Sequence, residues 1–199
     1  LFHNGSLLLV ARVGTSPWVV RDNFFNVETL IATGFSASFA PDYNGFRIGL
    51  NSFGGANNRT GIAPAFQEGP LGQYYFGTGN IQSLVNAGGR SAFDAGLVHF
   101  TTQPGAFTRE GDSTVDIGFH YATVDSNGGP PDTDGDGILD KDEDLNLNGR
   151  TDPGETSDLD RDTDLDGDSD PDELRMGTDP TDARSLKWRG LASWGIDDD

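Results

Sequence analysis

Residues 132–155 read DTDGDGILDKDEDLNLNGRTDPGE. This stretch combines many carboxylates with few apolar side chains, so it cannot bury a hydrophobic core of its own. In water, without a counter-charge, such a segment repels itself and stays unfolded. The sequence therefore indicates either a disordered acidic linker or a segment that folds around bound cations.

The spacing of the acidic residues distinguishes these two possibilities. A twelve-residue calcium loop has oxygen ligands at positions 1, 3, 5, 9 and 12, a carbonyl ligand at position 7 and glycine at position 6. Three segments match this pattern in full: loop one (132–143), loop two (144–155) and loop three (162–173). Chance does not place glycine sixth and glutamate twelfth in all three, so we favour calcium binding over a linker. The predicted metal ligands are Asp132, Asp134, Asp136, Ile138, Asp140 and Glu143 in loop one, Asp144, Asn146, Asn148, Arg150, Asp152 and Glu155 in loop two, and Asp162, Asp164, Asp166, Asp168, Asp170 and Glu173 in loop three.

The ligand types indicate which metal binds. Ligand sets made only of oxygen favour calcium over zinc or copper, and magnesium rarely accepts a cage made entirely of protein. We expect about three calcium ions, one for each loop. Loop two has Asn146 and Asn148 in place of aspartates, so it carries less charge and is expected to bind more weakly or to share ligands.

The junction between loops one and two differs from paired EF-hands. Glu143 ends loop one and Asp144 begins loop two, so no helices fit between them. We expect neighbouring ions to lie close together along this segment.

Further acidic and amide side chains flank the three loops. Those between loops two and three are candidates for extra ligands, and the others are second-rank candidates for which turn formation is the favoured role. They are Asp158 and Asp160, and then Asp125, Asn127, Asp179 and Asp182.

The charge is distributed unevenly along the chain. Of the 32 acidic and 13 basic residues, residues 125–199 hold 24 and 7, and the whole chain has a net charge of −19. So acidic a chain is unsuited to nucleic acid, which needs basic surface, and to anionic membranes. With no cysteine, the chain has neither disulfides nor thiolate metal sites. No apolar run reaches the roughly 18 residues of a membrane span.

Residues 1–124 carry strand signals and almost no helical periodicity. Segments rich in β-branched and aromatic residues alternate with Gly, Asn, Ser and Pro clusters, which predicts an all-β fold. The expected strand segments are 6–13, 17–34, 45–53, 72–76, 95–102 and 114–124. A β-sandwich and a parallel β-helix both remain open on this pattern.

Asparagines near the start of the chain favour the β-helix. In such a solenoid, an Asn at a turn stacks on the Asn of the next coil, and each amide satisfies backbone groups. Asn4, Asn23 and Asn26 are the candidates. Asn23 and Asn26 follow Asn4 by 19 and 22 residues, which is a plausible length for one coil.

Several longer phrases resemble known families. "LFHNGSLLLV" and "WVVRDNFFNVETL" (1–10 and 18–30) resemble the last coils of right-handed parallel β-helix proteins of Verrucomicrobia- and Planctomycetes-type bacteria. Residues 69–102 and 110–155 look like the end of those large secreted proteins. The acidic loops, with "RMGTDPTDARS" (175–185), are similar to thrombospondin type 3 and dockerin-type calcium repeats. "LASWGIDDD" (191–199) resembles the opening strand of a concanavalin-like domain.

The resemblance implies a domain plan. Residues 1–124 would be the end coils and cap of a right-handed parallel β-helix, with a β-sandwich as the alternative. Residues 125–185 would be a mostly irregular, calcium-stabilised repeat module, and residues 186–199 a linker or the start of a following domain. The abrupt opening "LFHNGSLLLV" suggests that the chain is a fragment of a longer extracellular protein.

The leading functional hypothesis is structural. The segment would be a rigid stalk or adhesion element at a bacterial surface, or a component that assembles head to tail into filaments with copies of itself. The alternatives are the C-terminal part of a β-helix polysaccharide lyase and an adhesin that binds extracellular polysaccharide.

A catalytic site is not expected in this segment. His3, His99 and His120 are scattered among strand residues and form no nucleophile-and-base pattern. Asp94 and Asp116 are expected to brace turns.

Aromatic side chains raise the possibility of a sugar platform. Tyr74, Tyr75, Phe76 and Trp18 are the candidates. Aromatic residues in strands are, however, usually part of the core.

Overall fold

The computed structural model describes residues 1–10, 18–33 and 39–186. Strands outnumber helices in this part of the chain, and the helices are short, which confirms the expectation of a β-rich fold. The chain divides into two compact units. Unit 1 comprises residues 1–131 and 146–150, and unit 2 comprises residues 132–145 and the described residues from 151 onward.

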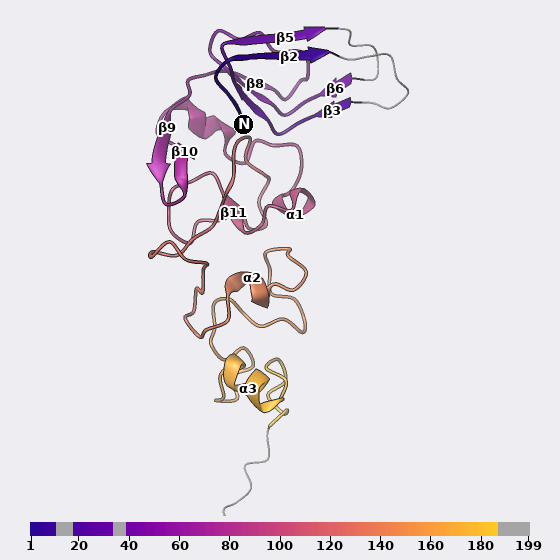
Figure 1. The fold of residues 1–199 in the computed structure, drawn as a ribbon. Coiled ribbons are helices and arrows are strands. Elements are labelled where there is room, and N and C mark those ends of the chain that lie inside the picture. Colours follow the sequence, from indigo (N-terminus) through magenta and orange to yellow (C-terminus); the bar gives the residue numbers. More distant parts are fainter. Residues whose placement is uncertain (11–17, 34–38, 187–199) are drawn as a thin grey trace, which may run out of the picture. The chain divides into compact units, whose positions relative to one another are not determined.

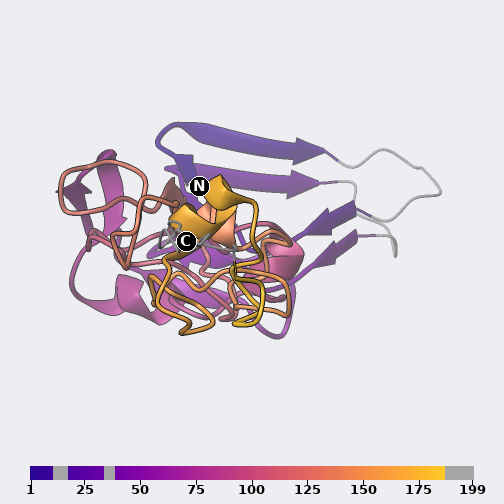
Figure 2. The same ribbon diagram turned by 90° about the horizontal axis from the view of Figure 1, so that it is seen from below.

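Parallel strand pairs dominate the first sixty residues of unit 1. A four-stranded sheet has the order β1 (Phe2–His3), β4 (Phe24–Asn26), β7 (Gly45–Arg47) and β8 (Arg59–Ile62). Two further pairs are β2 (Ser6–Val10) with β5 (Thr29–Thr33) and β3 (Trp18–Val20) with β6 (Phe39–Pro41). Figure 1 shows the arrows of β2 and β5 side by side and pointing the same way, and Figure 2 shows these strands from below. The succession β1, β2, β3 is thus repeated by β4, β5, β6.

The register of these pairs places equivalent residues on top of one another. Phe2 lies opposite Phe25 and Ser6 opposite Thr29, a displacement of 23 residues along the chain. Trp18 lies opposite Phe39, a displacement of 21 residues. Because the repeat length changes only slightly, residues of similar type lie opposite one another in neighbouring strands.

Phe24 and Phe25 show that the middle strands are covered on both faces. Successive side chains of a strand point to opposite faces, yet both phenylalanines are fully buried. Phe25 lies in an aromatic stack, with ring centroids 5.1 Å from Phe2 and 5.2 Å from Phe46. Phe24 belongs to the main hydrophobic cluster. That cluster contains Phe24, Ile62, Phe76, Ile81, Leu84, Ala87 and Ile117.

A buried asparagine stack lines the turns that precede β4, β7 and β8. The Oδ1 atom of Asn44 accepts a hydrogen bond from the Asn23 amide at 3.2 Å, and Asn58 Oδ1 accepts one from the Asn44 amide at 2.8 Å. Asn44 is fully buried and donates through Nδ2 to the Val20 carbonyl at 2.7 Å. An asparagine stack at the turns is therefore present, and Asn23 is the one predicted residue that belongs to it.

The other two candidates for this stack have different roles. Asn4 adopts a left-handed backbone with φ of 60°, and its amide donates to the Asn26 carbonyl at 2.9 Å. The Asn26 side chain lies 2.6 Å from Nδ1 of His3. The prediction was wrong for Asn4 and Asn26, because the stacking repeat is 21 residues from Asn23 to Asn44 and not the spacing measured from Asn4.

The remainder of unit 1 is antiparallel or irregular. The hairpin of β9 (Phe66–Gly69) and β10 (Gly72–Phe76) precedes the 3-10 helix Asn80–Leu84 and helix α1 (Ala92–Ala95). Strands β11 (Phe100–Thr101) and β12 (Tyr121–Ala122) pair farther along the chain. The strands expected over 95–102 and 114–124 are much shorter than predicted.

Helix α1 explains part of that difference. Ser91 accepts a hydrogen bond from the Asp94 amide as N-cap, and Gly96 ends the helix in the left-handed conformation. The N-cap and the terminal glycine make residues 92–95 helical, so the strand predicted to begin at residue 95 does not start there.

Some predictions fall on residues that are not described. These are parts of the segments 6–13 and 17–34, the side chain of Trp18, and residues 187–199 of the expected linker. Among the described residues, no helix has the length and apolar character needed to cross a bilayer.

The buried asparagine stack yields a test. Replacing Asn44 by Ala removes its side-chain hydrogen bonds and leaves buried backbone groups without partners, so unit 1 is expected to lose roughly 2–4 kcal/mol. Urea unfolding monitored by circular dichroism measures this loss. Asn57→Ala, at an exposed position beside the same turn, is the control and is expected to change stability far less. Equal losses for the two variants would contradict a structural role of the stack.

Candidate metal centre

Loops one and three both lie in unit 2 and have the same local structure. Each begins with an irregular acidic segment and ends in a short helix, α2 (Asp140–Glu143) in loop one and α3 (Asp170–Met176) in loop three. Position nine of the loop is the first residue of the helix in both. Position twelve therefore lies about one helical turn later.

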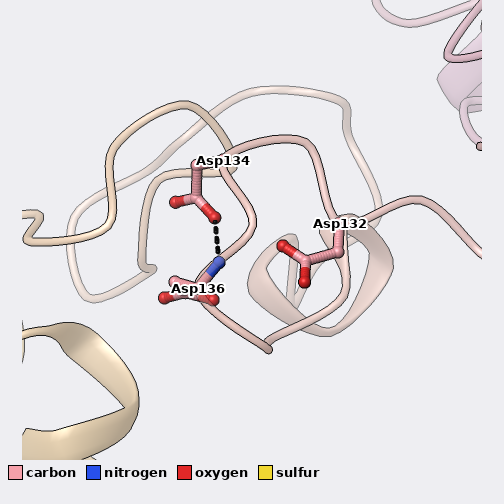
Figure 3. A group of neighbouring side chains, drawn as sticks. All are labelled: Asp132, Asp134 and Asp136. Carbon is pink, nitrogen blue, oxygen red and sulfur yellow. Dashed lines mark hydrogen bonds between the residues drawn. The ribbon is translucent and has the colours of Figure 1, made fainter.

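Three carboxylates of loop one converge. Asp132, Asp134 and Asp136 offer oxygen atoms that all lie within 4.8 Å of one another, as Figure 3 illustrates. One oxygen of each side chain accepts a backbone hydrogen bond: Asp132 from Gly135 at 2.8 Å, Asp134 from Asp136 at 3.0 Å and Asp136 from Ile138 at 2.7 Å. The Oδ2 atoms of Asp134 and Asp136 are buried without a hydrogen-bond partner. The turns thus hold the carboxylates in place and leave one oxygen of Asp134 and one of Asp136 without a partner.

Loop three repeats this arrangement thirty residues later. Asp162, Asp164 and Asp166 form an equivalent group, with oxygens within 4.8 Å of one another. Asp164 accepts a hydrogen bond from the Asp166 amide at 3.1 Å, and Asp166 accepts one from the Asp168 amide at 2.9 Å. Asp162 Oδ1, Asp164 Oδ2 and Asp166 Oδ2 are buried and unpartnered. Both loops can therefore hold a metal ion.

Glycine at position six has a geometric reason. Gly137 and Gly167 have φ values of 108° and 101°, in the region that other residues rarely adopt. This turn directs each glycine amide back to the first aspartate of its loop, at 3.1 Å from Asp132 Oδ2 and 2.9 Å from Asp162 Oδ2.

A threonine at position two braces position nine, a contact that the sequence analysis missed. Thr133 donates to Asp140 through its amide at 2.7 Å and its hydroxyl at 2.8 Å. Thr163 binds Asp170 in the same way, at 2.8 and 2.6 Å. The recurrence of Asp-Thr-Asp at the start of both loops was the signal available in the sequence.

The glutamates at position twelve are the most unusual groups in unit 2. Glu143 and Glu173 are only 2% and 1% exposed, and neither oxygen of either side chain has a hydrogen-bond partner. Burial, reinforced by Asp134, raises the pKa of Glu143 to about 8. Burial and then Asp164 raise the pKa of Glu173. An ionised carboxylate is stable in such a place only if a cation compensates it.

Acidic side chains take the place of a hydrophobic core in unit 2. Among the described residues, every fully buried side chain of the Leu, Ile, Val, Phe, Tyr and Ala type lies between residues 24 and 124. Leucines of unit 2 such as Leu159 and Leu165 are 73% and 74% exposed. Apart from Pro180, the buried residues from 132 to 186 outside 146–150 are Asp140, Glu143, Asp144, Glu155, Asp170 and Glu173.

Loop two is divided between the units. Asn146, Asn148 and Arg150 belong to unit 1, where Asn148 accepts a hydrogen bond from the Arg150 amide at 2.8 Å and Arg150 pairs with Asp112 at 3.1 Å. Gly149 has φ of 79° and packs so closely against Val98 that a Cβ atom would lie 2.8 Å from it.

The remaining ligands of loop two belong to unit 2. Asp144 and Glu155 are both buried, and Glu155 accepts a hydrogen bond from the Asp152 amide at 2.9 Å. A metal site in loop two stays a prediction, as do the carbonyl ligands at Ile138, Arg150 and Asp168.

Loops one and three come together in space. Asp136 and Glu143 of loop one form a third group with Asp170 of loop three, again with oxygens within 4.8 Å of one another. Loops one and three are therefore not two spatially separate sites.

The flanking acids form turns. Asp125 accepts from the amides of Asn127 and Gly129 at 2.8 and 2.7 Å. Asp179 accepts from the Thr181 amide at 3.0 Å, and Asp182 from the Arg184 amide at 3.2 Å.

The titratable groups of unit 1 serve as braces. Asp116 accepts hydrogen bonds from the Asn86 amide at 2.7 Å and from the Thr102 hydroxyl, and burial raises its pKa. His120 Nε2 lies 2.9 Å from Glu110 in a buried pair.

The aromatic candidates for a sugar platform divide in two. Tyr75 and Phe76 are buried core residues. Tyr74 is half-buried and packs edge-on against His3 and Phe66.

Comparison with models of known families, with curated proteins and with solved structures found no match.

The raised carboxylate pKa values predict how metal-free unit 2 responds to pH. Glu143 binds its proton more tightly when folded than when unfolded, so its contribution favours folding below its ordinary pKa near 4.5 and is lost as pH rises towards 8. Asp134, Asp136, Asp164 and Glu173 shift in the same direction. In buffers stripped of divalent cations, unit 2 is therefore expected to be more protected from hydrogen exchange at pH 5 than at pH 8.

A substitution isolates the glutamate. Glu143→Gln is expected to flatten the pH dependence, while Asp142→Asn, at an exposed neighbour, leaves it as it is. Protection that rises from pH 5 to pH 8 in the absence of metal would contradict this account.

Proposed function

We propose that residues 132–173 bind calcium and that this binding folds a structural module of an extracellular or surface protein. The observation that carries the proposal is the burial of Glu143 and Glu173 with all four carboxylate oxygens unpartnered. Position twelve supplies the bidentate ligand of a calcium loop, so these are the groups that a bound ion would satisfy.

The types of ligand atom in these loops favour calcium over other divalent cations. Carboxylate and carbonyl oxygens are hard ligands, and loops of this kind tolerate the six to eight contacts that calcium takes. Magnesium demands a tighter octahedron and retains its waters. We propose about three ions, with loops one and three as the sites best supported by geometry.

Metal binding would supply the folding energy of unit 2. A segment whose buried side chains are acidic gains little from the hydrophobic effect. Ion coordination replaces that contribution, because an ion that binds the folded state alone stabilises it in proportion to the logarithm of its concentration. Millimolar extracellular calcium would keep such a module folded.

For the first sixty residues we propose coils of a right-handed parallel β-helix. Supporting this are the repeated order of β1–β3 and β4–β6, the parallel pairing of all three sets and the buried asparagine stack. A solenoid followed by an ion-stiffened segment suits a stalk or spacer. The thrombospondin type 3 resemblance of the acidic loops agrees with that role.

Calcium dependence is the direct test. Calcium is expected to increase helical circular dichroism and to protect residues 132–185 from proteolysis, and a calcium concentration about 100-fold above the Kd stabilises the fold by about 2.7 kcal/mol for each site. Isothermal titration calorimetry gives the number of ions, and magnesium at the same concentration is expected to do much less.

Matched variants show whether the loops are responsible. Glu143→Gln with Glu173→Gln is expected to abolish the response to calcium, whereas Asp142→Asn with Asp172→Asn removes the same charge from exposed side chains and preserves it. If calcium alters neither folding nor proteolysis of the parent chain, the proposal fails.

Self-assembly has a separate basis, in an exposed apolar face of the β2–β5 pair. Leu8 of β2 lies opposite Ile31 of β5, and the two side chains are 60% and 47% exposed. Val10 of β2 is 47% exposed. Exposed apolar patches favour contact with another chain, so we propose contacts between copies through this face.

Leu8→Lys tests these contacts. A charge on this apolar face is expected to lower the concentration-dependent light scattering of the chain. Ile48→Lys introduces the same charge at a 63% exposed position that follows β7 and is expected to have no such effect. Scattering that Leu8→Lys leaves unchanged would exclude assembly through this face.

A further inference from the structure

Asp170 stands at the meeting point of loops one and three. It is the first residue of helix α3 and has no exposed surface. Its carboxylate accepts two hydrogen bonds from Thr163, and its amide donates to the Arg161 carbonyl at 3.0 Å. Each carboxylate oxygen has two lone pairs, so the contacts to Thr163 leave the group able to bind a cation as well.

The oxygen atoms of Asp170 reach ligands of loop one. Asp136, Glu143 and Asp170 each place an oxygen within 4.8 Å of the others, although they span 35 residues of sequence. Asp136 Oδ2 and both oxygens of Glu143 are buried and unpartnered. Two oxygens on one calcium ion, with contacts of 2.3–2.6 Å each, are at most about 4.6–5.2 Å apart. The separation therefore fits three ligands of a single ion.

Arg161 holds the two loops at this distance. Its Nε atom donates to the Asp134 carbonyl at 2.8 Å, and its Nη2 atom donates to the Gly135 carbonyl. Its own carbonyl accepts from Asp170. Arg161, which directly precedes loop three, thus binds the backbone of loop one. It also binds Asp170, whose side chain reaches the acidic residues of loop one.

The contact is directional. Asp140 occupies position nine of loop one and has the same threonine brace as Asp170. Among the described residues, the groups of three converging acids include Asp170 with loop one and do not include Asp140 with loop three.

We propose that Asp170 of loop three ligates the same divalent cation as Asp136 and Glu143 of loop one, so that this ion cross-links the two loops. The inference rests on the proposed calcium function. It adds that loop three supplies one ligand to the ion bound by loop one. A cation at this place neutralises three carboxylates that would otherwise repel one another. Loop one then reaches full affinity only when loop three is folded against it, which couples the two sites.

The amide signals of Gly137 and Gly167 report on each loop separately. Each glycine is the sixth residue of its loop and donates to that loop's first aspartate. Calcium titration of the full chain, followed by nitrogen–proton NMR, gives a midpoint for each loop. Removing even an indirect support of a metal ligand commonly weakens binding about 10–100-fold, so Asp170→Asn is expected to raise the Gly137 midpoint at least about tenfold.

Two controls separate a lost ligand from other effects. Asp172→Asn removes one charge from the same helix at an exposed side chain paired with Arg175, and it is expected to leave the Gly137 midpoint unchanged. Thr163→Val keeps the Asp170 carboxylate and removes the hydroxyl half of its brace. It is expected to weaken calcium binding to loop three, which raises the Gly167 midpoint. It is expected to shift the Gly137 midpoint much less than Asp170→Asn does.

The outcomes distinguish this inference from the function on which it rests. If calcium shifts neither glycine in the parent chain, the proposed function fails. If both glycine signals respond to calcium and Asp170→Asn shifts the midpoint of Gly167 alone, calcium binding stands and the cross-link is overturned. Equal shifts of Gly137 in Asp170→Asn and Thr163→Val would also overturn it, because a disturbed loop three would then account for both.

Discussion

Burial of carboxylates that have no hydrogen-bond partner is the constraint on which unit 2 depends. Glu143 and Glu173 lie almost wholly inside, and none of their carboxylate oxygens has a hydrogen-bond partner among the described residues. Such a group either takes up a proton or acquires a cation. The turns of loops one and three favour the second solution, since they orient further free oxygens toward the same interior. The exposed leucines of unit 2 are consistent with this, because the interior is occupied by acids.

The two units represent opposite ways of satisfying buried polar groups. In unit 1 the asparagine stack links each turn to the next through hydrogen bonds, and the phenylalanine stack covers the strands beside it. The oxygen and the nitrogen of the buried Asn44 side chain both have hydrogen-bond partners within the chain. In unit 2 backbone amides bind one oxygen of each of four aspartates and leave the other without a partner; the four are Asp134, Asp136, Asp164 and Asp166. A bound ion is then part of the proposed fold rather than an addition to it.

Features that depend on residues only a few positions apart could be predicted from the sequence. The sixth-position glycines follow from the left-handed turn, and the ligand order follows from the loop, so residues 132–143 and 162–173 could be located from sequence. The braces from Thr133 and Thr163 were missed, since a threonine between two aspartates has many possible roles. Loop two has the same spacing, yet Asn148, Gly149 and Arg150 pack with unit 1. Spacing alone did not predict that division.

The sequence by itself determined that the chain is β-rich at its start and that its acidic part brings carboxylates together at a regular spacing. Both follow from periodicity and spacing, which act over a few residues. Tertiary structure decided which asparagines stack, because stacking depends on the number of residues between turns that brings Asn23 next to Asn44. It also decided that Asp170 meets Asp136 and Glu143. That meeting depends on the path of the chain between the loops and on the contacts of Arg161 with loop one, and no local pattern contains this path.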